Sequence, residues 1–535
     1  MIILHNANIY APDHPDATAL VIDRDRILAI GSDADILDGF SPASRVINLD
    51  GKTVWPGLID AHVHLRQLAE SVSMIDCETS TLEECLSRVK RAADQLLEGA
   101  WIKGHGWNQN RWQDGFGTAA MLDCVSGGRP AYLTAKSLHA AWANSRALQM
   151  AGIDVHTPDP PGGTIQRDAK GQPTGILLEA GAMGLVEAVL PKPSPGETIA
   201  KLTNLMPKLW AVGLVGVHDF DDFNCWSALQ TINQKGTTSL RVHKSIPFDH
   251  LDEFIKAGLR TGFGHNRLNL GGVKLFSDGA LGPQTAAMHA PYEGTHTTGE
   301  LLLTEDELVE IGRLAVDHGI ALAVHAIGDR ANHIVLNAYE RLRAYEEDHH
   351  LPHLSHRIEH VQIVDPADLP RFAQLGIIAS VQPVHAPSDM IMADRYLGRR
   401  ANHAYAYRSI LASGAAYALG SDAPVEPFNP FLGLHAAVTR RRLDGSPGPE
   451  GWYPGQRLSL EEALTGFSHS PAVISGQGRQ LGKISPGYAA DFILLESNPF
   501  TMDPHQLGYI QPLATFIGGQ CVFNTTGIPF DAVLS

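Results

Sequence analysis

The sequence has 535 residues, of which 44% are hydrophobic and 19% charged, a composition typical of folded globular proteins rather than disordered chains. This length exceeds the usual single-domain range and predicts more than one structural unit. The formal net charge of −17, from 41 basic and 58 acidic side chains, argues against a nucleic-acid partner, because a phosphate backbone requires a positive footprint.

Cysteine usage and hydropathy bear on where the protein works. The five cysteines are scattered, odd in number and form no CxxC pair, which favours a reduced, cytoplasmic protein. We predict no signal peptide and no membrane span, because the apolar stretches are too short. The densest basic run, Arg440 to Arg442, is interpreted as a solvated helix end. We therefore expect no membrane partner and allow for a homodimer.

Both ends of the chain indicate short strands. Five apolar runs separated by polar turns carry this signal: 2–4, 19–22, 27–31, 491–495 and 514–517. Neither end could bury a core alone. We predict that residues 1–50 and 480–535 pair into one small β-sandwich.

Residues 51–479 alternate apolar, β-branched runs with amphipathic stretches, a pattern typical of parallel βα units. Eight of these runs are predicted barrel strands: 54–64, 214–220, 240–246, 268–276, 320–327, 357–361, 377–382 and 415–422. The predicted fold class is therefore α/β, a (β/α)₈ TIM-type barrel. About 150 residues separate the first two strands, so residues 70–190 are predicted to form an inserted subdomain above the barrel mouth.

The first predicted barrel strand ends in His62-Val63-His64. Side chains two apart on a strand face the same side, so these histidines could hold one metal ion. Alone, the pair is a weak signal among 26 histidines.

Polar residues also come late in four other apolar strands: Lys274, His325, His360 and Asp422. The carboxyl ends of parallel barrel strands converge on one face, so these groups should meet in one pocket. Each has a structural alternative: a hydrogen-bonded barrel histidine, an ion-paired lysine or a helix-capping aspartate. Together such groups would be costly to bury without an ion to unite them.

With these residues in place, the string Pro-Gly-Leu-Ile-Asp-Ala-His-Val-His at 56–64 resembles the amidohydrolase superfamily, and more narrowly its YtcJ-like branch, which includes N-substituted formamide deformylases. Further phrases support the resemblance: 272–282, 324–332, 358–362, 420–425 and 482–491. It covers nearly the whole chain, and its motifs are specific to the branch but not to a substrate.

The resemblance implies a divalent metal centre, with Zn²⁺ as the expected ion. His62 and His64 would hold one ion, and His325 and His360 a second. Lys274 would bridge the two after carboxylation of its amine, because a carbamate is anionic whereas an ammonium cannot ligate a cation.

With Lys274 unmodified, the alternative is a single-ion site formed by His62, His64, one later histidine and Asp422. In either case the ion would lower the pKa of bound water from 15.7 towards about 7. Asp422, a metal contact, would act as the catalytic general base and then as general acid. Asp60 could orient His62 or could be a strand-end turn residue.

The predicted insertion is rich in large side chains. Trp107 and Trp142 are predicted to wall an apolar substrate pocket, with the insertion's own core as the alternative. His139 is a second candidate catalytic residue, as a contact to the substrate or its oxyanion. Three residues of the barrel are further candidate substrate contacts: His218, Gln382 and Arg408. Arg408 could bind a substrate carboxylate or could pair with surface acids.

These observations predict a metal-dependent enzyme that cleaves a C–N bond, amide or formamide-like and non-peptide, in a small molecule. Hydrolysis of an ester, lactone or phosphotriester by the same site is an alternative. A non-catalytic scaffold homologue would be expected to lose metal ligands, whereas every ligand position here is filled.

Overall fold

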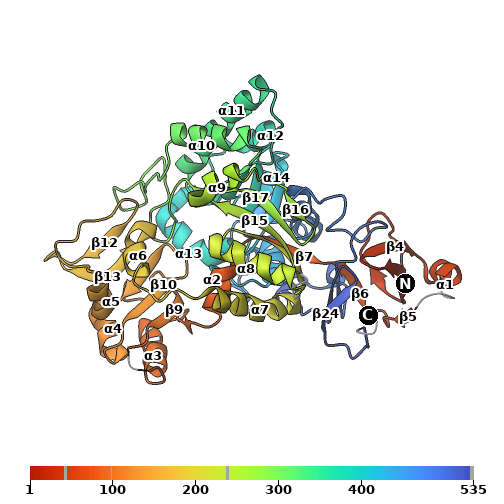
Figure 1. The fold of residues 1–535 in the computed structure, drawn as a ribbon, viewed down its shortest axis with the longest axis horizontal. Coiled ribbons are helices and arrows are strands. Elements are labelled where there is room, and N and C mark those ends of the chain that lie inside the picture. The colour runs from red at the N-terminus through yellow and green to blue at the C-terminus, as the bar shows by residue number, and fades with distance from the viewer. Residues whose placement is uncertain (41–44, 98, 237–239, 531–535) are drawn as a thin grey trace.

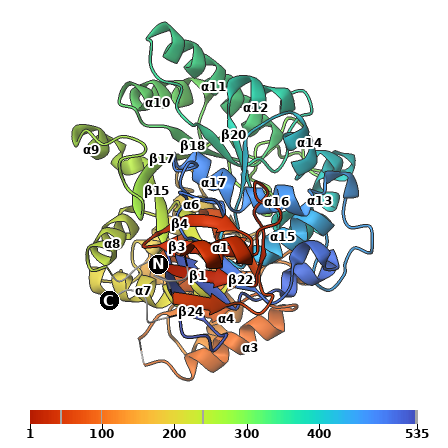
Figure 2. The ribbon, with the colours of Figure 1, turned by 90° about the vertical axis from the view of Figure 1, so that its right-hand side faces the viewer.

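The computed structural model describes residues 1–40, 45–97, 99–236 and 240–530. Figure 1 shows three parts side by side, with the insertion at the left, the barrel in the middle and a smaller β-structure with both chain ends at the right. Figure 2 views the molecule from the side of the chain ends, with α1 (Asp33–Phe40) in front. Residues 41–44 and 531–535, within the segments predicted to pair, lie outside the described residues.

Eight parallel strands of the central sheet form the barrel, in the order β21-β20-β19-β18-β17-β15-β14-β7, and the short β16 (Gly264–His265) pairs antiparallel with β17. The barrel strands are β7 (Leu58–Val63), β14 (Leu214–Asp219), β15 (Arg241–Pro247), β17 (Leu268–Phe276), β18 (Leu322–Ala326), β19 (Arg357–His360), β20 (Ile378–Val381) and β21 (Tyr417–Leu419). Each overlaps one predicted strand, and the predicted (β/α)₈ barrel is confirmed.

The barrel closes through the segment that follows β21. The amide of Asp422 donates to the carbonyl of His62 over 2.7 Å, and the amide of His64 donates to the carbonyl of Ala423 over 2.8 Å. These bonds place Asp422 directly beside the two histidines of β7. The same contacts therefore close the sheet and bring residues of the candidate site together.

Helices follow the barrel strands, and capping residues in the sequence mark where several of them begin. The main ones are α7 (Pro195–Ala211), α8 (Phe223–Gln234), α10 (Glu305–Asp317), α11 (Asp329–Asp348), α12 (Leu369–Leu375), α13 (His385–Leu397), α15 (Pro430–Thr439) and α16 (Leu460–Gly466). Capping boxes begin three of them, at Ser194, Thr304 and Ser459, where each hydroxyl accepts from a glutamate amide three residues on.

The predicted strand 54–64 is in fact two strands that belong to different sheets. β6 (Thr53–Pro56) pairs antiparallel with β22 (Phe492–Leu495), whereas β7 enters the barrel. Gly57 lies at the break, where an added Cβ would be 2.4 Å from Val215 Cγ1. Only glycine lets the chain pass this close to the second barrel strand.

The chain ends supply two sheets. One has the order β4-β3-β1-β5 and contains β1 (Ile2–His5), β3 (Ala19–Asp23), β4 (Arg26–Gly31) and β5 (Arg45–Asn48). The other has the order β2-β6-β22-β23-β24 and adds β2 (Asn8–Ile9), β23 (Ala514–Ile517) and β24 (Gln520–Asn524). Leu4 and Leu20 share one buried core with Phe492 and Phe516, so both ends are needed to cover it.

The insertion has its own sheet and core. Its strand order is β12-β13-β11-β10-β9-β8, over β8 (Ile75–Asp76), β9 (Ile102–Trp107), β10 (Ala131–Ala135), β11 (Ala140–Ala143), β12 (Thr164–Arg167) and β13 (Pro173–Leu178). The helices α3 (Leu82–Ala93), α4 (Ala119–Ser126), α5 (Ser145–Met150) and α6 (Glu179–Glu187) belong to the same part. The exact domain boundaries remain a prediction.

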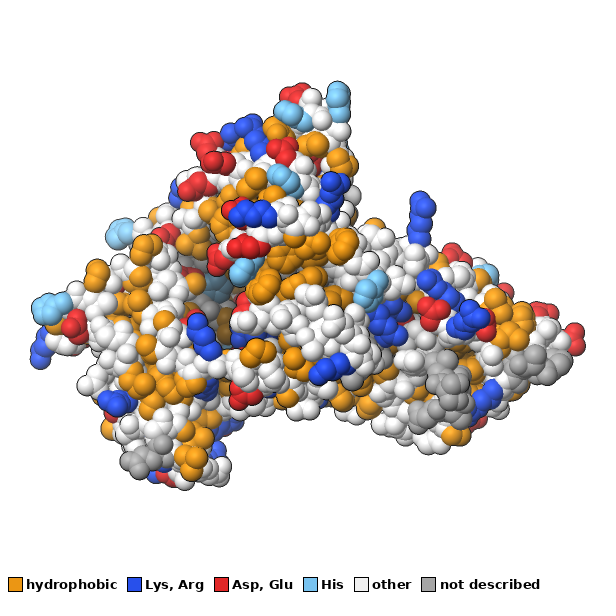
Figure 3. All heavy atoms as spheres, viewed as in Figure 1, with side chains coloured by type: hydrophobic (Ala, Val, Ile, Leu, Met, Phe, Trp, Pro, Cys, Tyr) orange, Lys and Arg blue, Asp and Glu red, His pale blue; other side chains and the backbone are white. Residues whose placement is uncertain are grey.

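The structure corrects the expectation that Arg440 lies at a solvated helix end. Arg440 is not solvated: it is fully buried, lies over the rings of Tyr407 and Trp452, and donates to the carbonyls of Tyr405 and Trp452. Basic and acidic side chains are interspersed on the face in Figure 3. In the described part of the chain, no helix has both the length and the hydropathy needed to cross a membrane.

Candidate metal centre

The six predicted metal-binding residues come together at the carboxyl ends of the barrel strands. His62 and His64 end β7, Asp422 follows β21, and the others lie on three separate strands: Lys274 on β17, His325 on β18 and His360 on β19. All except His62, which lies just behind them, line one cavity of about 450 Å³ between the barrel mouth and the insertion.

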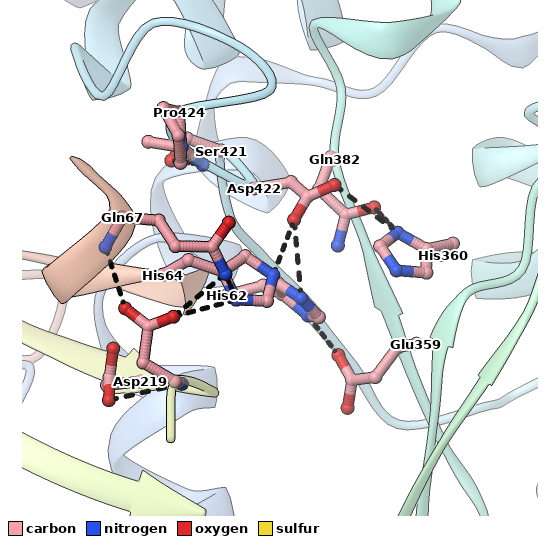
Figure 4. Close-up of polar contacts among 12 residues, drawn as sticks. His62, His64, Gln67, Asp219, Glu359, His360, Gln382, Ser421, Asp422 and Pro424 are labelled. Atoms are coloured by element: carbon pink, nitrogen blue, oxygen red, sulfur yellow. Dashed lines mark hydrogen bonds and ion pairs between the residues drawn. The ribbon is translucent and has the colours of Figure 1, made fainter. Parts of the chain in front are cut away.

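Asp422 is the residue on which the imidazoles converge (Figure 4). Its Oδ1 lies 3.4 Å from Nε2 of His62 and 3.4 Å from Nε2 of His64, and its Oδ2 lies 3.9 Å from Nδ1 of His360. Ligand atoms of His62, His360 and Asp422 all fall within 4.8 Å of one another, close enough to share one cation. Although burial acts to raise it, hydrogen bonds with His385 and His64 hold the pKa of Asp422 well below its usual range.

Lys274 and His325 flank this group. Lys274 Nζ lies 4.8 Å from the ring centres of Phe220 and Phe276 and has no hydrogen-bond partner in the described part of the chain. Burial lowers the pKa of Lys274 to about 8. The ring centre of His325 is 4.6 Å from that of His360, and its Nε2 lies 3.0 Å from the carbonyl oxygen of Gly279. Nδ1 of His325 is therefore the atom left to bind a cation.

The donor set fits a metal ion. Nε2 of His62 and Nζ of Lys274 are buried, and neither makes a hydrogen bond with a residue that the structure describes. Leaving two such groups unsatisfied is costly unless a further partner completes them. A divalent cation is a partner that neutral imidazoles and a carboxylate can share.

Glu359 is a site residue that sequence reasoning missed. Its Oε2 lies 2.6 Å from Nδ1 of His62, which turns Nε2 of that ring towards Asp422. Neighbouring strand residues normally face opposite sides, so Glu359 and His360 should not share the pocket. A φ of 77° at His360 breaks this alternation and lets both reach inwards.

His64 is held in a similar way by Asp221, which was also missed. Asp221 Oδ1 lies 3.6 Å from Nδ1 of His64. With Asp219 and Cys225 it forms a second group of ligand-type atoms within 4.8 Å. Lys244 Nζ, 3.2 Å from Asp219 Oδ2, already supplies a positive charge there. We interpret this second group as support for the metal centre.

Asp60 supports the backbone rather than the ring of His62. Its Oδ1 accepts hydrogen bonds from the amides of His62 (3.0 Å) and Ser421 (2.9 Å), which ties β7 to the segment after β21. The orienting role that the sequence left open for Asp60 falls to Glu359 instead.

His139 enters the cavity from the insertion. Its Nδ1 lies 2.7 Å from Oε2 of Glu179, and its ring centre is 5.5 Å from that of His325. Burial acts to lower the pKa of His139, but the charge and hydrogen bond of Glu179 outweigh it and raise that pKa. Glu179 adopts a left-handed φ of 61°, which turns its carboxylate to this histidine. The pair can present a protonated nitrogen to a bound molecule.

Of the five predicted substrate contacts, Trp107 alone lines this cavity. Trp107 is fully buried and donates from Nε1 to the carbonyl of Leu133, so it also belongs to the insertion core. Trp142 lies wholly in that core, with its ring 6.2 Å from that of Trp112, which matches the alternative predicted for Trp142, the insertion's own core. Gln382 accepts from Nδ1 of His360 over 3.0 Å and holds this imidazole instead of lining the cavity.

His218 and Arg408 also lie outside the cavity, and Arg408 follows the second of its two predicted alternatives, pairing with an acidic residue. His218 lies deeper in the barrel, with Nδ1 2.9 Å from Arg357 Nη1, and lines a small separate hollow that also contains His243. Arg408 forms a two-pronged ion pair with Glu462 and donates to the carbonyl of Arg457. Neither side chain lines the cavity, and the pairing of Arg408 with an acidic residue satisfies its charge locally.

Known proteins share this architecture. The amidohydrolase family model matches residues 45–523. YtcJ of Bacillus subtilis (strain 168), which is named for the same family, is 33% identical over 90% of this chain and 91% of its own. N-substituted formamide deformylase of Arthrobacter pascens is 29% identical over 98% of this chain and 99% of its own. The crystal structure of an uncharacterized metal-dependent hydrolase from Pyrococcus furiosus matches with a TM-score of 0.74 and 29% identity, over 93% of this chain and 99% of that one.

Fold and site together define a barrel hydrolase whose polar residues converge at the carboxyl ends of the strands. The chain belongs to the amidohydrolase family, and the resemblance predicted from its motifs is confirmed.

Proposed function

We propose that this protein is a metal-dependent hydrolase that cleaves a non-peptide C–N bond, amide or formamide-like, in a small molecule. The observation that carries the proposal is the convergence of His62, His64 and His360 on Asp422, beside a buried Lys274 whose Nζ has no hydrogen-bond partner in the described structure. Cytoplasmic location and a homodimer remain predictions.

We propose one or two divalent ions, with Zn²⁺ as the first choice. His62 and His64 would hold one ion together with Asp422, and His325 and His360 would hold the second. Addition of CO₂ to the neutral amine of Lys274, with loss of one proton, would give the anionic carbamate that a two-ion site requires. When bound, the metal supplies Lewis-acid polarisation of the scissile carbonyl and acidifies the attacking water.

Side chains of the protein then transfer the protons and stabilise the developing charge. Asp422 takes a proton from the water at a carboxylate oxygen and returns it to the leaving nitrogen, so that the amine departs neutral. His139, kept protonated by Glu179, donates a hydrogen bond to the carbonyl oxygen as negative charge develops there. Glu359 and Asp221 keep His62 and His64 in fixed orientations throughout.

The test is metal analysis of the purified protein combined with a hydrolysis screen over N-formyl and N-acyl compounds, before and after chelation. We expect bound divalent metal, activity that disappears on chelation, and recovery when Zn²⁺ is restored. Asp422→Asn should retain metal but lower kcat by about 10²–10⁴-fold, the range for loss of a general acid–base group. Undiminished turnover by the metal-stripped protein would contradict the proposal.

Ester, lactone or phosphotriester hydrolysis is the alternative within enzymes, since the same nucleophile serves both. Matched amide and ester substrates of equal shape separate the two by their relative kcat/KM. A non-catalytic scaffold predicts no turnover of either, with metal bound or not.

A further inference from the structure

Asp389 is a sheltered carboxylate of the cavity wall that has no role in the proposed reaction. Asp389 lies on α13 and lines the cavity together with His385 and Met392 of the same helix. Its Oδ2 accepts a hydrogen bond from the hydroxyl of Tyr405 over 2.7 Å. Asp389 forms no ion pair with any residue that the structure describes, so its other oxygen is available to a bound molecule.

The cationic groups of the wall outside the metal centre are already paired. Lys136 Nζ lies 2.9 Å from Glu78 Oε1 and 3.1 Å from Glu426 Oε2, and is held between two carboxylates. His139 is matched by Glu179. Away from Lys274 at the metal centre, the described wall therefore offers no unpaired cation for a substrate carboxylate.

The position of Asp389 suits the non-reacting end of a substrate. On α13 it lies four residues after His385, a rise of about 6 Å along the helix. His385 Nε2 is 3.4 Å from Asp422 Oδ2, so the helix leads from the reacting end of the cavity to Asp389. The wall also includes apolar Phe276, Leu281 and Met392, which can cover a short hydrocarbon spacer.

Asp389 itself is partly sheltered from solvent. Burial raises the pKa of Asp389, while His385, the Tyr405 hydroxyl and Lys136 act in the opposite direction. A sheltered carboxylate gains more from a charge-assisted hydrogen bond than an exposed one, because water competes less.

We propose that Asp389 sets the substrate class by accepting a hydrogen bond from an amine or ammonium at the distal end of the substrate, and that the cavity disfavours a distal carboxylate. The expected substrate is thus an acylated or formylated diamine-like compound with an apolar spacer. This inference rests on the proposed function, because it identifies the far end of a molecule hydrolysed at the same centre.

The experiment compares three N-formyl compounds with equal spacers, made from butane-1,4-diamine, pentylamine and 5-aminopentanoate. Their affinities for the Zn²⁺-loaded protein are measured by calorimetry, and their turnover is measured separately. We expect the wild type to bind the ammonium compound about tenfold or more tightly than the methyl compound, as a charged hydrogen bond allows, and the carboxylate compound most weakly.

Asp389→Asn keeps the shape and an acceptor for Tyr405 but removes the charge. It should abolish the preference for the ammonium compound and leave affinity for the methyl compound within about twofold. Glu187→Gln is the matched control, because Glu187 also lines the cavity but is exposed and hydrogen-bonded to Tyr132. Its ammonium preference should persist.

An equal loss in both variants, undetectable binding of the ammonium compound, or tightest wild-type binding of the carboxylate compound would overturn the assignment of Asp389. Ammonium selectivity without turnover of any compound would support Asp389 and count against the proposed function. Turnover of all three compounds with unchanged selectivity in Asp389→Asn would support the proposed function and count against the role of Asp389.

Discussion

Replacing Glu359 with glutamine tests whether the buried carboxylate behind His62 organises the metal centre. Glu359 is fully buried, lies 2.6 Å from Nδ1 of His62, and neutralises the guanidinium of Arg357. The substitution leaves Arg357 without its carboxylate, and an unpaired buried charge costs about 3–5 kcal/mol. Loss of the anionic partner of a metal-binding histidine lowers metal affinity by about 10–100-fold.

The pKa of Glu359 determines how the stability difference between the two proteins changes with pH. Burial opposes ionisation, but Arg357 and His62 outweigh it and hold the pKa of Glu359 well below its ordinary value of 4.5. A depressed pKa contributes stability that is present above the ordinary value and is lost as pH falls through the folded-state value. The difference in urea midpoint between wild type and Glu359→Gln should therefore be greatest near neutrality and shrink in acid.

The assay is urea unfolding of the metal-free proteins together with Zn²⁺ competition against a coloured chelator. Glu462→Gln is the control, because Glu462 pairs with Arg408 near the surface, where an ion pair contributes about 1 kcal/mol or less. If Glu359→Gln bound Zn²⁺ within twofold of wild type and unfolded at the same urea concentration, Glu359 would not be the organising residue.

Two further substitutions test the roles assigned to His139 and Arg408. Glu179→Gln should lower the pKa of His139, and the alkaline limb of the kcat/KM profile should move to lower pH by about one to two units, equivalent to a charged hydrogen bond; an unmoved limb would mean that protonated His139 is not the hydrogen-bond donor to the carbonyl oxygen. Arg408→Ala should change kcat/KM by less than about twofold, since Glu462 engages this guanidinium outside the cavity; a selective loss with carboxylated substrates would restore its predicted substrate role.

The barrel could be predicted from the sequence because the pattern of its strands and helices is local and repeated. Five of the eight apolar runs carry a predicted metal-binding residue near their carboxyl end, and strand direction alone placed those ends on one face. His62, Lys274 and His360 were found for this reason. The break at Gly57 was missed because the run 54–64 is continuous in hydropathy, and the clash that requires glycine involves Val215, a residue distant in sequence.

The missed site residues share a different physical cause. Glu359 faces inwards because the backbone at His360 has a positive φ, which no periodicity rule anticipates for histidine. Asp221 comes directly after the predicted strand 214–220, where an aspartate is equally common as a turn residue. For Trp142 the sequence left pocket wall and insertion core open, because aromatic content cannot distinguish them; packing against Trp112 decides for the core.

The layer beneath the candidate metal centre is polar, whereas branched apolar residues dominate the interior of TIM-type barrels in general. From His62 the chain of contacts runs through Glu359 to Arg357 and on to His218, whose ring centre is 4.6 Å from that of His243. Burying such groups is no more stable than apolar packing, so stability alone does not explain them. These contacts fix the orientation of each side chain, because each must face the neighbour that it bonds. The contact with Glu359 in turn directs Nε2 of His62 towards Asp422. The candidate metal centre is therefore held in place by this lower layer as well as by the residues that converge on Asp422.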